Sequence, residues 1–169
     1  NSTVSGCTRR GIELRRQTAV RLVSTLVTGV VEGHGIVCTR SSNAVIDSCT
    51  VTDNGGHGIV ASGSAPEISY CEISGNEDHG VRSIKVGAPR IARSTITDNE
   101  MGVSVEQGSS AILGNNMYPE TGYNSIYGNT RAAVANYNGV ESPVFARWNW
   151  WGSSTPYGRL FIGHVTYNP

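Results

Sequence analysis

The sequence has no surplus of charge of either sign, because its 169 residues include 13 Lys and Arg against 13 Asp and Glu. A protein that holds nucleic acid or an acidic membrane by electrostatic attraction needs a clear excess of Lys and Arg. Long apolar runs are absent as well, since the most apolar region, residues 20–31, is interrupted by Arg21, Ser24 and Gly29. We therefore expect no nucleic-acid partner and no membrane insertion.

Leucine is outnumbered by Val and Ile, and glycine is abundant at 21 residues. β-branched side chains favour strands, and glycine favours turns. The composition therefore excludes a helical bundle and favours an all-β fold.

A pair made of glycine and an aliphatic residue recurs along the chain at spacings of 24, 23, 22 and 22 residues. Each unit carries a second and a third apolar position, separated by Gly, Ser, Asp and Asn. Three strands too short to bury a face alone, repeated at this period, describe a coil that stacks on copies of itself. The sequence thus predicts a single-stranded parallel β-helix, a solenoid of about six coils of roughly 22 residues. The pairs begin at Gly11, Gly35, Gly58, Gly80 and Gly102; the second positions are Leu22, Ile46, Ile68, Ile91 and Ile112, and the third are Val27, Val51, Ile73 and Ile96.

An asparagine stands three residues after the third apolar position of successive units, at Asn54, Asn76, Asn99 and Asn129. Asparagine tolerates the left-handed backbone of a tight turn, and its amide can hydrogen-bond to the same side chain on the next coil. These residues are predicted to form a structural ladder.

The regular spacing fails in one unit, where residues 113–125 contain an insertion. Insertions in repeat proteins form loops on one face, often the binding face. We divide the single expected domain into β-helix coils over residues 1–147 and a closing segment over residues 148–169, which starts at Trp148 and covers the open end of the core.

Several segments resemble the right-handed parallel β-helix proteins of the pectate-lyase-like group, which includes carbohydrate-binding proteins and sugar hydrolases. They are residues 51–59, 96–103, 124–129, the Asn-Trp-Trp-Gly element at 149–152, and residues 162–169. The resemblance implies a right-handed helix that is closed at its C-terminal end by the Asn-Trp-Trp-Gly element. It also implies a secreted or cell-surface protein of bacterial or archaeal type.

Proteins of this group usually open with a capping element, and none is visible before Gly11. The chain also begins at Asn1 without a Met or a leader. We therefore expect it to be the C-terminal part of a larger protein.

Three histidines, His34, His57 and His79, directly precede repeat glycines and are expected to stack on neighbouring coils. Such a row could hold a metal or act in acid–base chemistry, although a turn position that tolerates histidine is the favoured explanation. The Gly-His-Gly around His57 and the segment from Arg82 to Lys85 resemble elements of polygalacturonases, but the clustered aspartates those enzymes need are missing. His57, His79, Arg82 and Lys85 are thus weak catalytic candidates, and no catalytic residue or metal ligand is assigned.

Two glutamates, Glu77 and Glu100, each follow a ladder asparagine, with Asp78 alongside. Carboxylates gathered at one turn could bind calcium, although exposed carboxylates without a ligand are commoner. No other cofactor is expected.

A partly basic column lies five residues beyond the repeat glycine, where Arg40 and Lys85 stand. Acidic glycans are bound by such cations, so Arg40 is a ligand-binding candidate, with solvated surface as the favoured alternative. The full column is Arg16, Arg40, Gly63, Lys85 and Gln107.

Aromatic rings of the inserted loop and the closing segment are the main candidates for ligand binding, because flat rings stack on sugar faces. They are Tyr118, Tyr123, Trp148, Trp150 and Trp151, with Tyr157 nearby. For the tryptophans, closure of the core is the alternative and the favoured role.

Two cysteines, Cys49 and Cys71, are expected at equivalent positions on adjacent coils, close enough for a disulfide. Buried unpaired thiols are the favoured alternative, because cysteine packs as a small apolar side chain.

The fold carries many activities, so function must come from the site. A non-catalytic carbohydrate-interacting or structural region of a secreted or surface protein is the first hypothesis. A polysaccharide lyase or glycoside hydrolase with part of its site on missing N-terminal coils is the second, and a spacer or adhesin that binds protein is the third.

Overall fold

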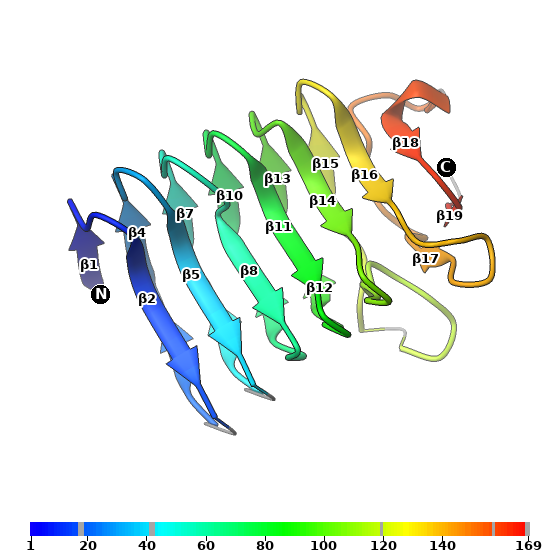
Figure 1. The fold of residues 1–169 in the computed structure, drawn as a ribbon. Helices are drawn as coiled ribbons and strands as arrows, with labels where there is room; N and C mark the ends of the chain where they lie inside the picture. Colours follow the sequence, from blue (N-terminus) through cyan, green and yellow to red (C-terminus); the bar gives the residue numbers. More distant parts are fainter. Residues whose placement is uncertain (17–18, 41–42, 119, 157, 168–169) are drawn as a thin grey trace.

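The chain folds into a stack of parallel coils, as Figure 1 shows from the blue N-terminal coil to the red C-terminal end. The structure is a computed structural model that describes residues 1–16, 19–40, 43–118, 120–156 and 158–167. No described residue lies in an α-helix, so no helix in these ranges could cross a bilayer.

Three parallel sheets form the sides of the stack, and we call them sheets A, B and C. Sheet A contains β1 (Ser2–Ser5), β4 (Thr25–Thr28), β7 (Thr50–Thr52), β10 (Glu72–Ser74), β13 (Thr95–Thr97) and β15 (Ser125–Tyr127). Sheet B contains β2 (Arg10–Arg15), β5 (His34–Thr39), β8 (Ile59–Ser62), β11 (His79–Ile84), β14 (Met101–Val105), β16 (Ala132–Asn136) and β18 (Phe161–Ile162). Sheet C contains β3 (Arg21–Val23), β6 (Val45–Asp47), β9 (Glu67–Ser69) and β12 (Arg90–Ala92).

The all-β parallel solenoid predicted from the period is confirmed, and its register follows the repeat. Ile36 pairs with Ile59, and Ile59 with Val81, so the aliphatic residues after the repeat glycines form one buried column. Sheet B has seven strands, which gives about seven coils where the sequence indicated about six. The added strand is β18, which pairs with β16 although it lies in the closing segment.

The repeat glycines are explained by the close approach of successive coils. A Cβ on Gly58 would lie 2.7 Å from the carbonyl oxygen of Gly80 and 2.8 Å from Cγ2 of Ile73. A Cβ on Gly80 would likewise lie 2.6 Å from Cγ2 of Ile96. A Cβ at Gly58 or Gly80 would therefore push neighbouring coils apart, which explains why glycine marks the period there.

The asparagine ladder is confirmed at the turn between sheets A and B. Asn54 Nδ2 donates to Asn76 Oδ1 at 2.8 Å, and Asn76 Nδ2 donates to Asn99 Oδ1 at 2.9 Å. Asn99 Nδ2 continues to Asn129 Oδ1 at 3.1 Å. The same oxygens accept main-chain N–H groups, as Asn54 Oδ1 does from Val30 at 3.1 Å. The ladder therefore satisfies polar groups that the turns bury.

The second apolar position of the irregular coil is Leu113, and its assignment to Ile112 is wrong. Ile112 lies opposite Arg90, which faces outward, whereas Leu113 is fully buried in the core. Side chains alternate between the two faces of a strand, so a shift of one residue exchanges inside and outside. From Leu113 the chain leaves the stack, and it rejoins sheet C where Gly122 pairs with Ala92.

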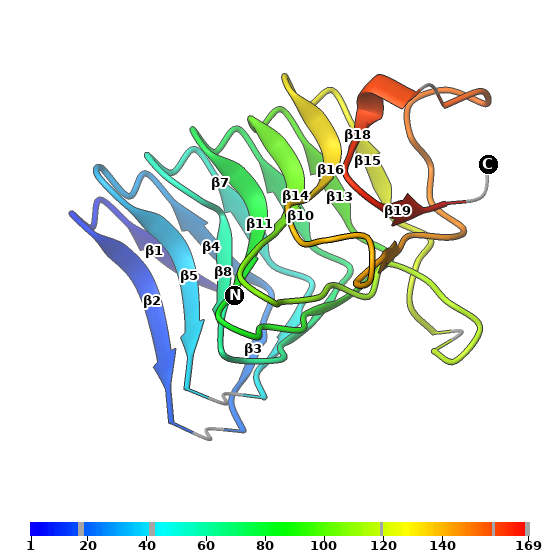
Figure 2. The same ribbon diagram turned by 45° about the vertical axis from the view of Figure 1, so that its right-hand side comes forward.

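The closing segment covers the last coil with rings. Trp151 continues the third apolar column after Ile126, is 3% exposed and meets Phe161 edge to face at 4.9 Å. Phe161 stacks on Tyr167 at 4.0 Å. The remaining elements are the two-stranded sheet of β17 (Val144–Phe145) and β19 (Val165–Thr166) and the short turn η1 (Gly158–Leu160). Figure 1 labels β17, β18 and β19 at this end of the stack, and Figure 2 shows β18 and β19 there from another side.

Candidate functional site

The turn between sheets C and A is built the same way in six successive coils. Its first residue has a left-handed backbone, with φ between 48° and 59°, and stands three residues before the third apolar position. The residue that follows it points into the stack. The left-handed positions are Ser24, Ser48, Tyr70, Arg93, Tyr123 and Trp148, and the inward ones are Thr25, Cys49, Cys71, Ser94, Asn124 and Asn149.

A second polar ladder runs through the inward positions and fixes these turns. Asn124 Nδ2 donates to Asn149 Oδ1 at 2.9 Å, and Asn124 Oδ1 accepts the main-chain N–H of Ser94 at 3.0 Å. Ser94 Oγ accepts the N–H of Cys71 at 3.1 Å. Because each side chain holds the neighbouring turn, the left-handed residues beside them are kept in line along the stack.

The outward side chains of this turn form a row of rings and one guanidinium, which we call the aromatic column: Tyr70, Arg93, Tyr123 and Trp148. The Arg93 guanidinium carbon lies 5.7 Å from the centre of the Tyr70 ring and 5.8 Å from that of Tyr123. The rings of Tyr123 and Trp148 lie 6.3 Å apart at 14° to one another. Tyr70 and Tyr123 are each 58% exposed, so their rings are available to a ligand.

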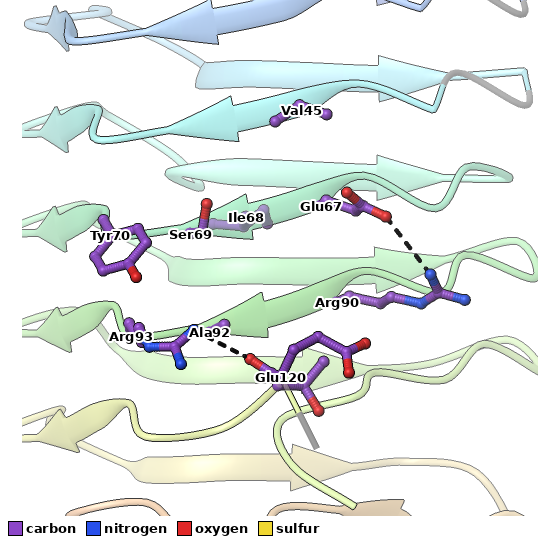
Figure 3. Close-up of a pocket in the computed structure, with 10 residues that line it drawn as sticks. Val45, Glu67, Ile68, Ser69, Tyr70, Arg90, Ala92, Arg93 and Glu120 are labelled. Carbon is purple, nitrogen blue, oxygen red and sulfur yellow. Dashed lines mark hydrogen bonds and ion pairs between the residues drawn. The ribbon is translucent and has the colours of Figure 1, made fainter. Parts of the chain in front are cut away.

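A hollow of about 240 Å³ lies over the outer face of sheet C and is bordered by two members of the aromatic column, Tyr70 and Arg93. We call it the sheet C groove. Figure 3 shows Tyr70 and Arg93 at one end of its strands and Glu67 and Arg90 at the other, with Glu120 of the inserted loop beside them. Arg90 forms an ion pair with Glu67 at 3.5 Å, and Arg93 donates to the carbonyl oxygen of Glu120 at 3.5 Å. Its surface therefore combines ring faces with charged hydrogen-bonding groups.

The inserted loop is fastened to the groove through Tyr118. The Arg90 guanidinium carbon lies 4.4 Å from the centre of the Tyr118 ring. Asn115 Oδ1 accepts the N–H of Tyr118 at 2.8 Å, and Thr121 Oγ1 donates to the Tyr118 carbonyl at 2.6 Å. The loop thus presents Glu120 and Thr121 to the groove from a braced position.

A family model described as a right-handed β-helix region matches residues 1–144. This span covers the coils from β1 to the start of β17. The chain belongs to the right-handed β-helix family. No curated protein and no solved structure matches this β-helix significantly. Its placement in the pectate-lyase-like group stays a prediction.

The aromatic residues proposed from the sequence are distributed over three places in the β-helix. Tyr123 and Trp148 continue the aromatic column beyond Arg93, which lines the sheet C groove, and Tyr118 lies against Arg90, which also lines it. Trp150 is 50% exposed and pairs with Ser125 beside sheet A, while Trp151 is enclosed in the core. Arg40 lies outside the groove, in a hollow at the end of sheet B, and Tyr157 falls outside the described residues.

Two groove residues, Tyr70 and Arg93, were missed by sequence reasoning. Both stand three residues before a third apolar position, as Tyr123 and Trp148 do. This spacing was available in the sequence. The sequence does not reveal the left-handed backbone that turns these side chains outward in one row.

The imidazole column of His34, His57 and His79 is present on the outer side of sheet B. The rings stack at 4.6 Å and 4.8 Å. Nδ1 of His34 accepts the main-chain N–H of His57 at 3.1 Å, and Nδ1 of His57 accepts that of His79 at 3.2 Å. Burial, with the neighbouring histidines and Arg82, lowers the pKa of His57 to about 3.

Three of the four weak catalytic candidates belong to this column or touch it. Arg82 pairs with both carboxylate oxygens of Glu106 and places Nη1 3.1 Å from His57 Nε2. A neutral imidazole accepts at one nitrogen only, so Arg82 competes for His57 with the main chain of the next coil. Lys85 lies apart, at a turn beyond β11. His57, at the centre of the cluster, is buried, and its ring contacts both Arg82 and the main chain of the next coil, which is typical of a structural arrangement.

The acidic residues considered for calcium are shared between two turn positions. The main-chain N–H of Glu100 donates to the main-chain carbonyl oxygen of Asp78, so Glu100 lies on the coil next to Asp78 at the same turn position. The N–H of Glu77 donates to the carbonyl oxygen of Asn54, so Glu77 occupies another turn position. Asp78 lies 3.5 Å from Nδ1 of His57, and Glu100 lies 3.5 Å from Nδ1 of His79. In the described ranges no group of three or more His, Cys, Asp and Glu is arranged to hold a metal ion.

Cys49 and Cys71 occupy neighbouring steps of the second polar ladder. Their sulfurs are not joined, and each thiol lies against main-chain carbonyls, Cys71 at 3.2 Å from Ser69 and Cys49 at 3.4 Å from Asp47. The neighbouring Cys49 and burial together raise the pKa of the Cys71 thiol. These contacts fill the turn as the asparagines do in later coils.

Proposed function

We propose that this β-helix is a non-catalytic carbohydrate-binding region that holds a polysaccharide in the sheet C groove. The observation that carries the proposal is the aromatic column, in which rings and one guanidinium follow one another on successive coils, with Tyr70 and Tyr123 exposed. Pyranose rings present flat C–H faces, and such faces stack on aromatic side chains. A ligand lying across several coils would meet one ring or guanidinium at each step.

The polar groups of the groove suit the edges of sugar rings. Glu67, Arg90 and Glu120 place acceptors and donors along the groove, and Ser69 adds a hydroxyl. Ligand sites of this kind combine apolar contact with a few polar groups that fix orientation. Binding of a polysaccharide would agree with the secreted or surface location that the resemblance implies. Cell fractionation tests that location.

The test is a calorimetric titration in which soluble polysaccharides are added to the wild type and to the Tyr123→Ala/Trp148→Ala variant. Neutral β-glucan and xylan serve as binding probes, and polygalacturonate is added only for the end-group assay below. We expect the affinity for the bound polysaccharide to fall about tenfold, because two ring contacts are removed. Trp150→Ala is the matched control, since it removes an exposed tryptophan outside the aromatic column and is expected to bind as the wild type does.

Two results would count against the proposal. Equal affinity of the double variant and the wild type would remove the aromatic column from recognition, and the absence of binding to every probe would favour a spacer. The same samples are assayed for new reducing ends and unsaturated ends. Their formation would support the lyase or hydrolase alternative.

A further inference from the structure

The far end of sheet B carries a second hollow, which is separate from the sheet C groove and has a volume of about 410 Å³. We call it the basic hollow. Its eight lining residues are Arg10, Glu13, Arg15, Thr39, Arg40, Ser62, Gly63 and Lys85. Four cations surround one carboxylate there, although the whole chain has equal numbers of basic and acidic residues.

The basic hollow follows from a turn column like the one that builds the groove. Arg16, Arg40, Gly63, Lys85 and Gln107 all have left-handed backbones, with φ between 54° and 58°. Main-chain bonds keep them in register, such as Arg40 N–H to Ser62 at 3.3 Å and Gly63 N–H to Ile84 at 3.0 Å. The column predicted from the sequence spacing is therefore a structural row.

Gly63 interrupts this row and creates a notch between two cations. The side chains of Arg40 and Lys85 stand on the coils to either side, and the glycine position between them carries none. Thr39 and Ser62 are half-buried neighbours in register on adjacent strands, and both line the hollow. An entering group would meet hydroxyl donors below and cations on both sides.

The charges of the basic hollow are only partly neutralised. Glu13 holds both Arg10 and Arg15 at 2.6 Å. Among the described residues Arg40 and Lys85 form no ion pair, so their donors face the notch without a carboxylate. Cations gathered around a hollow attract anions, and charge-assisted hydrogen bonds from Arg and Lys are the strong ones.

We propose that the basic hollow binds an oxyanion, a carboxylate or sulfate group borne by an acidic polysaccharide, with the anion seated above Gly63 between Arg40 and Lys85. Its lining residues come from four successive coils, an arrangement that suits a chain that carries such groups at intervals. This site uses none of the residues of the aromatic column and stands or falls independently of the groove.

The sharpest test exchanges Gly63 for two side chains of equal size. Asn and Asp both tolerate a left-handed backbone, and the Cβ of either would lie 3.3 Å from the Lys85 carbonyl oxygen. Gly63→Asp places a carboxylate in the notch, whereas Gly63→Asn places a neutral amide there. We expect Gly63→Asp to bind polygalacturonate or dextran sulfate at least about tenfold more weakly than Gly63→Asn. Equal binding of the two variants would overturn the proposal.

A charge-removal pair tests the same site without filling it. Arg40→Gln/Lys85→Gln is expected to lose about tenfold in affinity, because two charge-assisted bonds are removed. Arg131→Gln/Arg159→Gln removes the same charge elsewhere and is expected to bind within about twofold of the wild type. Equal losses in the two double variants would mean that net charge, and no particular site, governs binding.

The probes distinguish the sources of the anion. Sodium sulfate, neutral dextran and single-stranded oligothymidylate are titrated beside polygalacturonate and dextran sulfate. Binding of an acidic polysaccharide with weak response to the other three supports the proposal. Oligothymidylate binding as tightly as the polysaccharides, or response to sulfate ions alone, would overturn it. Tyr123→Ala/Trp148→Ala is expected to leave this binding unchanged, so failure here and failure of the groove proposal are separable.

Discussion

Two columns of stacked rings run along this β-helix, and they differ in what the ring atoms contact. In the imidazole column His57 is buried and His34 and His79 are half-buried, and the ring spacings of 4.6 Å and 4.8 Å follow the coils. Nδ1 of His34 and Nδ1 of His57 each accept a main-chain N–H. The aromatic column is exposed, and its members contact one another at 5.7–6.3 Å. Stacking alone therefore does not mark a binding site. Exposure, together with ring faces free of main-chain bonds, does.

The largest difference between the columns is expected from removing the central histidine. His57→Ala deletes the ring between His34 and His79 and leaves the N–H of His79 without its acceptor. We expect the free energy of unfolding to fall by about 2–3 kcal/mol, from lost packing and an unsatisfied buried donor. Urea unfolding, monitored by tryptophan fluorescence, measures this loss in the free energy of unfolding.

His164→Ala is the control for that variant, because His164 is exposed and makes one ring contact, at 2.8 Å to the Val140 carbonyl. Its expected loss is less than about 1 kcal/mol. A His57→Ala protein as stable as the wild type would show that the imidazole column carries no structural role.

A change of pH is expected to alter the free energy of unfolding by less than the loss of the His57 ring does. The lowered pKa of His57 means that the unfolded chain binds a proton near pH 6.5 while the folded ring stays neutral down to about pH 3. Stability is therefore complete above pH 6.5 and declines as pH falls toward 3. Between pH 6.5 and 5 the decline from this residue is on the order of 1 kcal/mol.

The pH dependence is measured in parallel on the wild type and His57→Gln, whose amide can still accept from His79. We expect a flatter profile for the variant between pH 6.5 and 5. Superimposed slopes in the two proteins would show that His57 titrates alike in the folded and unfolded states.

The smallest effect on stability is expected from the aromatic column. Tyr70→Ala removes an exposed ring whose centre lies 5.7 Å from the guanidinium carbon of Arg93. The free energy of unfolding is expected to change by less than about 0.5 kcal/mol, since the turn is held by the inward ladder. Thermal unfolding checks this, and a loss as large as that of His57→Ala would erase the distinction between the two columns.

The repeat made most of the scaffold predictable. The glycine step, the asparagine ladder and the stacking of the histidines all follow from residues recurring at one period, because each coil repeats the same packing problem. Prediction failed at Ile112 because the insertion begins there, and the repeat no longer fixes which residue faces inward. The paths of residues 114–118 and 120–121 obey no period either, so the groove that Glu120 and Thr121 line could not be predicted from the sequence.

The candidate sites were harder to predict because they depend on backbone conformation. Tyr123 and Trp148 were chosen for their chemistry, but their alignment with Tyr70 and Arg93 requires a left-handed backbone at residues that are not glycine. Such a conformation leaves no clear trace in residue type. The basic column was visible from its spacing, whereas the notch at Gly63 emerged from the stacked coils.

The left-handed turns of the aromatic column repeat at a fixed interval along the β-helix, so a polymer bound there is compared with that interval. Main-chain hydrogen bonds between parallel strands set the interval at about 4.8 Å, whatever side chains the turns carry. A polymer whose units repeat at a commensurate length stays in phase with successive turns, while one of another length drifts out of phase after a few units. Affinity for a mismatched polymer would thus stop rising at a short chain length, and the discrimination would reside in the backbone pitch.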